Sequence, residues 1–292
     1  MPAFKQFRVD PDDKFRLKDR DPADTAGFKS RKEAKERLAA GIERLRELQE
    51  RLYAHDRWAL LLIFQAMDAA GKDSTIEHVM SGVNPQGCQV YSFKQPSAEE
   101  LDHDYLWRTN KCLPERGRIG VFNRSYYEEV LVVRVHTGIL AAEKLPADLV
   151  DEDIWKQRFK DINAFERYLA QNGTAIVKFF LHVSKEQQRR RFLARLDEPQ
   201  KNWKFSLSDV KEREHWDEYM AAYEEMLRRT STEHAPWHVI PADHKWFMRM
   251  AVADIIVGTL EKLKPEYPTI TEERRRELEA ARKVLEQEEA KA

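Results

Sequence analysis

The chain has 292 residues, of which 42% are hydrophobic and 35% charged, and its 50 Lys and Arg against 51 Asp and Glu leave a formal net charge of −1. This balance excludes a globally basic protein that wraps nucleic acid and a strongly acidic protein that repels itself. The hydrophobic share is enough to build a folded core. With two cysteines, no secretory signal and no apolar run near the length of about 20 residues that spans a bilayer, we expect a cytoplasmic protein.

The predicted elements begin with a polar segment, residues 1–29, that lacks periodicity and is expected to be an extended arm. Residues 30–53 repeat apolar side chains at spacings of three and four, which predicts an amphipathic helix with Ser30 as its N-cap. Short apolar segments then alternate with helical ones. The predicted strands are 58–64, 88–94, 118–122, 174–183 and 237–241, and the predicted helices are 97–112, 125–136, 152–170, 184–196, 207–229 and 244–263.

This alternation is typical of βαβ units, so we expect an α/β fold with a parallel sheet and right-handed crossovers. The charge-dense residues after Pro265 predict a further helix. We divide the chain into the arm 1–29, a domain over 30–265 that includes a lid at about 185–230, and a charged helical tail over 266–292.

The segment AMDAAGKDST, residues 66–75, follows the most apolar strand and begins a helix. In that context the free N–H groups of the turn and of the first helical turn converge on an anion. Gly71 gives the turn its permissive backbone, and Lys72 supplies a charge to the transferred phosphoryl group. The match to the pattern G-x-x-x-x-G-K-[ST] is partial, because Ala66 and Asp73 replace two of its residues. The predicted phosphate-binding residues of this loop are Ala69, Ala70, Gly71, Lys72, Asp73, Ser74 and Thr75.

The alternative is that the small residues of this turn only allow close helix packing, while Lys72 points to water. Position favours phosphate binding, because ligands of α/β proteins bind at the carboxyl ends of strands. Asp68 also favours it, since an acidic side chain directly after an apolar strand is costly unless it is paired or bound to a cation. Asp68 is therefore the candidate ligand for Mg²⁺, with Mn²⁺ as the alternative metal.

The predicted strand 118–122 also ends in polar residues. P-loop enzymes usually offer a carboxylate to the metal here, but this chain has Asn123, a weaker metal partner. Arg124 suits a phosphate oxygen through its planar guanidinium. Glu128 is a candidate for the missing negative charge, with a solvated helix face as its alternative. Arg134 lies in an apolar stretch, so its head either reaches the surface or contacts an anion.

Residues 184–206 carry a net charge of +4. A charged run is usually a solvated helix face, but this one follows the end of a strand and contains a proline loop, which is typical of a mobile lid that closes on phosphates. Its basic residues include Arg189, Arg191 and Arg195. The spacing does not decide whether Arg189 and Arg191 face the site or the solvent. Lys94, at another strand end, is either an anion contact or an exposed loop residue.

Several segments together resemble the polyphosphate kinase 2 family, and specifically its class III. They are FQAMDAAGKDSTIEHVMSGVNPQG, SFKQPSAEELDHDYLWR, GRIGVFNRSYYEEVLVVRVH, and RFLARLDEPQKNWKFS with the following EREHWDEYMAAYEEML. The resemblance covers about residues 30–265. It implies a P-loop kinase-like, three-layer α/β/α core with a parallel sheet under a helical lid, similar to thymidylate kinase. It also implies phosphoryl transfer between inorganic polyphosphate and nucleotides with Mg²⁺, and a homo-oligomer, either a dimer or a tetramer.

By this resemblance, Asp68 matches the loop aspartate that holds magnesium, Lys72 the phosphate-binding lysine and Arg124 the arginine of the second motif. Other classes have an aspartate where this chain has Asn123, and an asparagine where it has Glu128. Both departures resemble class III, whose members phosphorylate both nucleoside monophosphates and diphosphates. The basic segment resembles the lid of the family, which implies that Arg189, Arg191 and Arg195 contact the anion.

We therefore expect in-line transfer of a terminal phosphoryl group from polyphosphate to AMP, ADP or another purine nucleotide. The predicted catalytic residues are Asp68, Lys72, Arg124 and Glu128. One rival is a nucleoside monophosphate kinase that uses ATP as donor with the same loop. The other is a non-catalytic protein that binds polyanions or RNA, although neither a nucleic acid nor a membrane is the expected partner.

Overall fold

The alternating apolar segments form a six-stranded sheet in the order β1-β6-β5-β2-β4-β3. The four pairs β6-β5, β5-β2, β2-β4 and β4-β3 are parallel, and only β1 pairs antiparallel, with β6, among the described residues. The computed structural model describes residues 4–11 and 14–289. The strands are β1 (Arg8–Val9), β2 (Ala59–Gln65), β3 (Cys88–Ser92), β4 (Ile119–Asn123), β5 (Thr174–His182) and β6 (Trp237–Pro241). The parallel sheet of an α/β protein is thereby confirmed.

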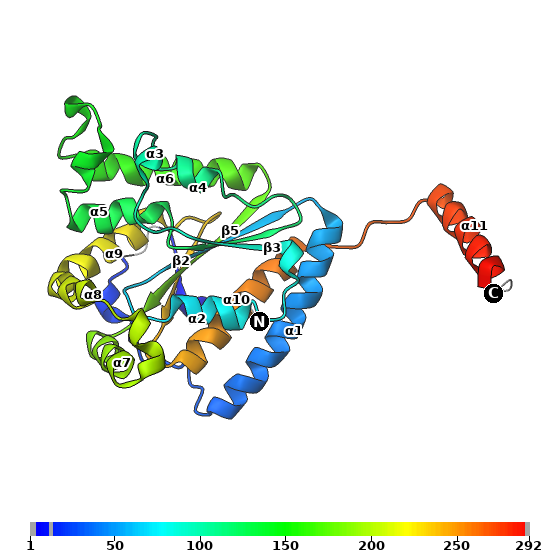
Figure 1. The fold of residues 1–292 in the computed structure, drawn as a ribbon, viewed down its shortest axis with the longest axis horizontal. Helices are drawn as coiled ribbons and strands as arrows, with labels where there is room; N and C mark the ends of the chain where they lie inside the picture. The colour runs from blue at the N-terminus through cyan, green and yellow to red at the C-terminus, as the bar shows by residue number, and fades with distance from the viewer. Residues whose placement is uncertain (1–3, 12–13, 290–292) are drawn as a thin grey trace.

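Helices cover both faces of this sheet, which gives three layers (Figure 1). One face carries α1 (Arg31–His55), α2 (Lys72–Val79) and α10 (Lys245–Leu263), and the other carries α3 (Ala98–Leu101), α4 (Trp107–Asn110), α5 (Val132–Val135), α6 (Ile154–Gln171) and α9 (Trp216–Thr230). The helices α7 (Lys185–Asp197) and α8 (Leu207–Glu212) lie beyond the carboxyl end of β5.

Strand β2 is buried at every residue because it lies between β4 and β5 and has helices on both faces. Its Phe64 is paired with Asn123 at the end of β4 and with Phe179 of β5. The register therefore sets the loop after β2 directly beside the polar residues that follow β4.

The N-terminal residues expected as an extended arm include two 3₁₀ turns, Lys5–Phe7 and Leu17–Asp19, and the short strand β1. Phe4 and Phe7 are buried, and both pack edge-on against Phe247 of α10. This part of the chain therefore contributes to the core and adds a strand to the sheet.

Three predicted helices are interrupted in the structure. The segment 97–112 forms only α3 and α4, and the carboxylate of Asp104 accepts a hydrogen bond from the Leu106 N–H at the break. Such a local side-chain bond competes with the helical one. The segment 125–136 is a 3₁₀ helix, Tyr126–Val130, followed by α5. The segment 207–229 is divided into α8, the 3₁₀ turn Arg213–His215, and α9.

A fully buried ion pair joins β5 to α6. Lys178 Nζ donates to Glu166 Oε2 at 2.6 Å, to the Tyr127 hydroxyl at 2.8 Å and to the Thr230 carbonyl oxygen at 2.7 Å. The hydroxyls of Tyr126 and Tyr127 donate to the other oxygen of Glu166. Both charged side chains are 0% exposed. Every N–H of the ammonium thus has an acceptor, as a charge sealed in the interior requires.

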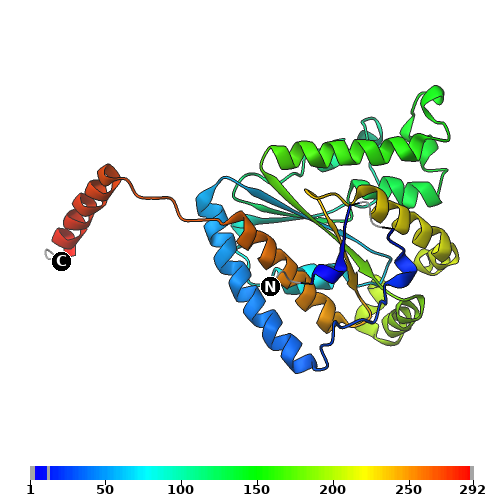
Figure 2. The ribbon, with the colours of Figure 1, turned by 180° about the vertical axis from the view of Figure 1, so that it is seen from behind.

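The last helix, α11 (Glu272–Glu289), stands away from the rest of the protein in both views (Figures 1 and 2). A segment without secondary structure, residues 264–271, connects it to α10. None of the helices in the described part of the chain is long and apolar enough to cross a bilayer.

Candidate active site

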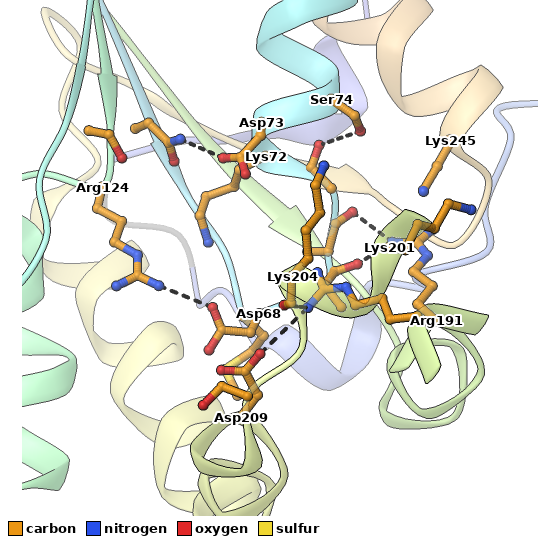
Figure 3. A pocket seen from close by; sticks show the side chains of 18 of the residues that line it. Asp68, Lys72, Asp73, Ser74, Arg124, Arg191, Lys201, Lys204, Asp209 and Lys245 are labelled. Atoms are coloured by element: carbon orange, nitrogen blue, oxygen red, sulfur yellow. Dashed lines mark hydrogen bonds and ion pairs between the residues drawn. The ribbon is translucent and has the colours of Figure 1, made fainter. Parts of the chain in front are cut away.

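A cavity of about 780 Å³ opens at the carboxyl ends of β2, β3 and β4 (Figure 3). Its walls come from the loop after β2, the ends of β3 and β4, the lid segment 191–209, and the first residue of α10. The charged side chains that line it are Asp68, Lys72, Asp73, Lys94, Arg124, Arg191, Arg195, Lys201, Lys204, Asp209 and Lys245. Eight of these are cationic and three are acidic, so the cavity suits an anionic ligand.

The loop after β2 has the backbone shape of an anion-binding turn. Ala69 and Gly71 both have positive φ, 59° and 108°, and Gly71 is the N-cap of α2. No side chain caps this helix within the described residues, so its first N–H groups remain available to a ligand. A Cβ on Gly71 would lie 3.3 Å from the end of the flexible Met248 side chain, so the positive φ is the main reason for glycine at this position.

Lys72 is held inside the loop that it follows. Its Nζ donates to the Ala66 carbonyl oxygen at 2.7 Å, and the residue is only 9% exposed. Burial, together with the nearby positive charge of Arg124, lowers the pKa of Lys72. A bound phosphate would remove the cost of leaving this ammonium desolvated, because it would supply the missing counter-charge.

The ends of β2 and β4 are joined by two polar contacts (Figure 3). Arg124 Nη2 donates to Asp68 Oδ1 at 3.1 Å, and Asn123 Nδ2 donates to Asp73 Oδ1 at 2.6 Å. Arg124 has a φ of 65°, a left-handed conformation that is uncommon outside glycine and that is typical of functional sites. The structure thus brings these four predicted residues together.

Glu128 lies beside this group but does not line the main cavity. It lines a smaller cavity of about 150 Å³ that also touches Asp68 and Arg124, and its carboxylate accepts a hydrogen bond from Gln65 Nε2 at 2.9 Å. Tyr219 and other side chains of the segment 212–223 close this smaller cavity. Glu128 is therefore placed near the loop rather than on a solvated helix face.

The start of the lid is attached to the loop. Arg191 Nη1 donates to the carbonyl oxygens of Ala69 and Ala70 at 3.0 and 2.6 Å, and its Nη2 donates to those of Ala242 and Asp243 at 2.5 and 3.1 Å. Gln188 Nε2 donates to the Asp68 carbonyl oxygen. Arg191 thus connects the turn after β2 with the turn after β6, besides adding charge to the cavity.

The far wall of the cavity concentrates positive charge. Lys201 and Lys204 come from the 3₁₀ helix Pro199–Lys204, and Lys245 is the first residue of α10. Burial lowers the pKa of Lys245 to about 8, and the neighbouring cations, of which Arg191 is the strongest, contribute. Neighbouring cations that lower one another's pKa are expected where an anion binds.

Three predicted contacts lie outside the cavity. Arg134 pairs with Glu225 of α9 at 2.6 Å, and Arg189 is exposed and pairs with Glu186 at 2.9 Å. The Thr75 hydroxyl donates to the Gly71 carbonyl oxygen and is buried in α2. None of these three side chains lines the cavity, whereas Arg195 and Lys94 do.

The carboxylates of the cavity fit a hard cation that phosphate oxygens also bind. Asp68 and Asp209 line the same cavity, and burial, together with the negative charge of Asp68, raises the pKa of Asp209. Within the described residues, no three or more His, Cys, Asp and Glu side chains are grouped so that they could hold a metal ion by themselves. Mg²⁺ commonly takes one or two carboxylates and completes its shell with water and phosphates. The residues present thus fit Mg²⁺ that is bound together with a phosphorylated ligand.

Four charged residues of the cavity were not predicted individually from the sequence: Lys201, Lys204, Asp209 and Lys245. The two lysines of the 3₁₀ helix belong to the basic segment already recognised. Lys245 had a weaker signal, since it begins the helix after the last parallel strand, at the sheet edge where the other strand ends meet. Nothing in the local sequence distinguishes Asp209 from the other acidic residues of the lid.

Comparison with known proteins places this site in a family. A family model described as Polyphosphate kinase 2 (PPK2) matches residues 28–268. An "ADP-polyphosphate phosphotransferase" of Rhodopseudomonas palustris is 55% identical over 282 residues, which are 96% of this chain and 98% of that protein. An "AMP/ADP-polyphosphate phosphotransferase" of Meiothermus ruber is 49% identical over 91% of this chain and 96% of that protein.

A solved structure has the same fold. The crystal structure of Polyphosphate Kinase 2 from Arthrobacter aurescens TC1 matches with a TM-score of 0.86 at 42% sequence identity, and the match covers 95% of this chain and 96% of that chain. A putative polyphosphate kinase 2 from Pseudomonas aeruginosa matches with a TM-score of 0.74 at 33% identity, over 82% of this chain and 49% of that chain.

Proposed function

Because this chain belongs to the polyphosphate kinase 2 family, we propose that it transfers the terminal phosphoryl group of inorganic polyphosphate to both AMP and ADP. The chain is a polyphosphate:nucleotide phosphotransferase of the P-loop kinase-like fold. The observation that carries the proposal is the cavity at the ends of β2 and β4, where Asp68, Lys72 and Arg124 meet a wall of lid cations.

The chemistry requires positioning and charge rather than a covalent intermediate. The N–H groups at the start of α2 and Lys72 hold the transferred phosphoryl group, and Arg124 neutralises charge on its oxygens. Asp68 would hold Mg²⁺, with Asp209 in the same cavity, and the metal would supply positive charge that neutralises phosphate oxygens. Lid residues Arg195, Lys201 and Lys204 contact the donor and exclude water from the reacting atoms.

We propose that Asn123 and Glu128 are the residues that allow both AMP and ADP to serve as acceptors. Asn123 reaches Asp73 and carries no charge, whereas Glu128, five residues further along the chain, adds a carboxylate beside Asp68 and Arg124 in the adjoining small cavity. In this proposal the carboxylate of Glu128 orients Arg124 and the acceptor nucleotide, and it does not occupy the phosphate-binding loop. The class III assignment, and with it the use of both monophosphate and diphosphate, rests on these two residues.

One assay tests donor and acceptor together. The purified protein is given AMP or ADP with either polyphosphate or ATP, and the formation of ADP and ATP is followed with and without Mg²⁺. We expect Mg²⁺-dependent product with polyphosphate and both acceptors. Turnover of AMP with ATP alone would make the chain an ordinary nucleoside monophosphate kinase. Salt-sensitive binding without any turnover would make it a polyanion-binding protein.

The pH dependence of donor binding is a second test. Because the pKa of Lys245 is about 8, its positive charge is present at pH 7 and is lost as the pH rises through that value. We expect the KM for polyphosphate to rise about threefold or more between pH 7 and 9, with kcat less affected. In Lys245→Arg the charge persists, so this rise should flatten. An equal rise in both proteins would show that Lys245 does not bind the donor.

We further propose the domain limits 30–265 with a lid at about 185–230, an N-terminal arm over 1–29 and a tail over 266–292. A cytoplasmic location and a homo-oligomer, either a dimer or a tetramer, complete the proposal. Sedimentation of the full chain over a range of concentrations tests the oligomer.

A further inference from the structure

A second large cavity is lined by the C-terminal half of α10, the first residues of β5 and the start of β6. Its volume of about 670 Å³ is typical of small-molecule sites. It shares no lining residue with the cavity that holds Asp68 and Lys72. Helix α10 contributes to both cavities, with Lys245 in the first and Thr259 in the second, about 21 Å further along the helix. A ligand of the second cavity is therefore bound apart from the reacting phosphates.

A glycine in the middle of α10 leaves open space in the wall of this second cavity. Ile255, Gly258 and Lys262 line the cavity at spacings of three and four, so they share one face of the helix. A Cβ at Gly258 would meet no atom within 4 Å, and the residue does not have a positive φ. Because glycine destabilises a helix interior relative to alanine, neither packing nor backbone geometry explains its presence here. The missing side chain widens the cavity beside the apolar Ile255.

Two histidine rings in the wall have polar atoms without partners. His238 is only 9% exposed, and its Nδ1 has no hydrogen-bond partner among the described residues. The same holds for Nε2 of His234. Burial lowers the pKa of His238 to about 4, and the charges of Arg8 and Lys262 contribute, so the ring is neutral at pH 7. A ligand with hydrogen-bonding groups would remove the cost of leaving these buried atoms unpaired.

The lining of the second cavity carries an excess of positive charge. Its four cationic side chains outnumber its two carboxylates, as Lys5, Arg8, Lys262 and Lys264 stand against Glu233 and Glu261. Glu261 is paired with Arg44 of α1, outside the cavity, at 3.1 Å, and Arg8 lies 3.2 Å from the exposed Asp10. The lysines also offset the negative partial charge at the C-terminal end of α10. Cations beside apolar side chains fit an organic anion, and phosphate groups are the anions that arginine and lysine bind best.

We propose that this cavity is a second nucleotide-binding site, distinct from the acceptor site of the phosphotransferase. The planar base lies against Ile255 in the space that Gly258 leaves, and its polar edge forms hydrogen bonds with His238. The phosphates extend to Arg8 and Lys262. A nucleotide combines an apolar ring, a hydrogen-bonding edge and several negative charges, whereas inorganic phosphate has only the charges. This inference goes beyond the proposed function and does not depend on it.

Counting bound nucleotides tests the proposal. In equilibrium dialysis with labelled ADP and Mg²⁺, without polyphosphate, the full chain should bind one more ADP than Gly258→Leu, whose side chain would occupy the cavity. Gly138→Leu is the matched control, because a Cβ there also meets no atom within 4 Å and Gly138 lines neither cavity. Equal binding by all three proteins would overturn the proposal. Displacement of the additional ADP by inorganic triphosphate as readily as by unlabelled ADP would also overturn it, since the base would contribute nothing.

Removal of single charges tests the phosphate contacts. Arg8→Gln and Lys262→Gln should each raise the dissociation constant of the additional ADP about fivefold. Lys283→Gln, on the exposed α11, makes the same charge change and should leave it unaltered. Effects no larger than that of Lys283→Gln would refute the proposed contacts.

The same proteins separate this inference from the proposed function. All five variants should retain Mg²⁺-dependent transfer from polyphosphate to ADP, because none of the substituted residues lines the cavity that holds Asp68 and Lys72. Retained transfer also confirms that they are folded. If the wild type showed no transfer, the proposed function would fail, whereas the loss of one bound ADP in Gly258→Leu alone would still support the second site.

Discussion

Lys72→Met should lower the turnover of polyphosphate-dependent ADP and ATP formation by at least about 100-fold. The methionine keeps the buried stem but removes the ammonium that lies beside the start of α2. Because that charge acts on the phosphoryl group as negative charge develops, its loss should appear in kcat more than in KM. Steady-state kinetics with a fixed excess of Mg²⁺ measures the change.

The control for this variant separates chemistry from folding. Lys211→Met makes the same replacement on the exposed side of α8, outside the cavity, and should leave the turnover close to that of the wild type. Lys72→Met should unfold at nearly the wild-type denaturant concentration, since it gives up one hydrogen bond to the Ala66 carbonyl oxygen, worth about 1 kcal/mol. Near-normal turnover in a folded Lys72→Met protein would contradict the assignment of the loop.

Lys178→Met should have the largest effect on stability. It leaves the Glu166 carboxylate 0% exposed, with two tyrosine hydroxyls but no cation. Removing one partner of a buried ion pair typically costs about 3–5 kcal/mol, because the remaining charge has neither water nor a counter-ion. We expect a loss of that size in the free energy of unfolding, measured by urea denaturation followed by circular dichroism.

A second substitution shows whether the unpaired charge is the cause. Lys178→Met combined with Glu166→Gln removes the charge and should recover a large part of the loss. Lys160→Met, at an exposed position of α6, is the matched control and should cost less than about 0.5 kcal/mol. If the double variant were no more stable than Lys178→Met, the cost would lie in packing rather than in the charge of Glu166.

Prediction from the sequence worked best where the residues that form a feature lie close together in the chain. The loop 66–75 combines its strand, turn and helix in one short segment, so its place between β2 and α2 could be inferred before the fold was known, while the roles of Asp68 and Lys72 stay predictions. The ion pair of Arg124 with Asp68 was not predicted; it arises because β2 and β4 are parallel neighbours whose carboxyl ends lie at one edge of the sheet.

The parts that prediction missed depend on contacts between distant segments. Lys245 and Asp209 reach the cavity only because α10 and the lid fold back over the strand ends, and neither has a distinctive local pattern. Arg134 was a reasonable candidate for an anion contact until α9 supplied Glu225 as its partner. Strand β1 has two residues, too few for a period to be recognised, and it exists because it pairs with β6.

The four carbonyl oxygens that Arg191 binds have a consequence for how the proposed lid can move. These hydrogen bonds attach the start of α7 to the loop after β2 and to the turn after β6. A movement that keeps them intact has to occur beyond Arg191, in the segment that carries Lys201 and Lys204. The guanidinium of Arg191 would then keep its positive charge at the loop while the two lysines changed their distance from it.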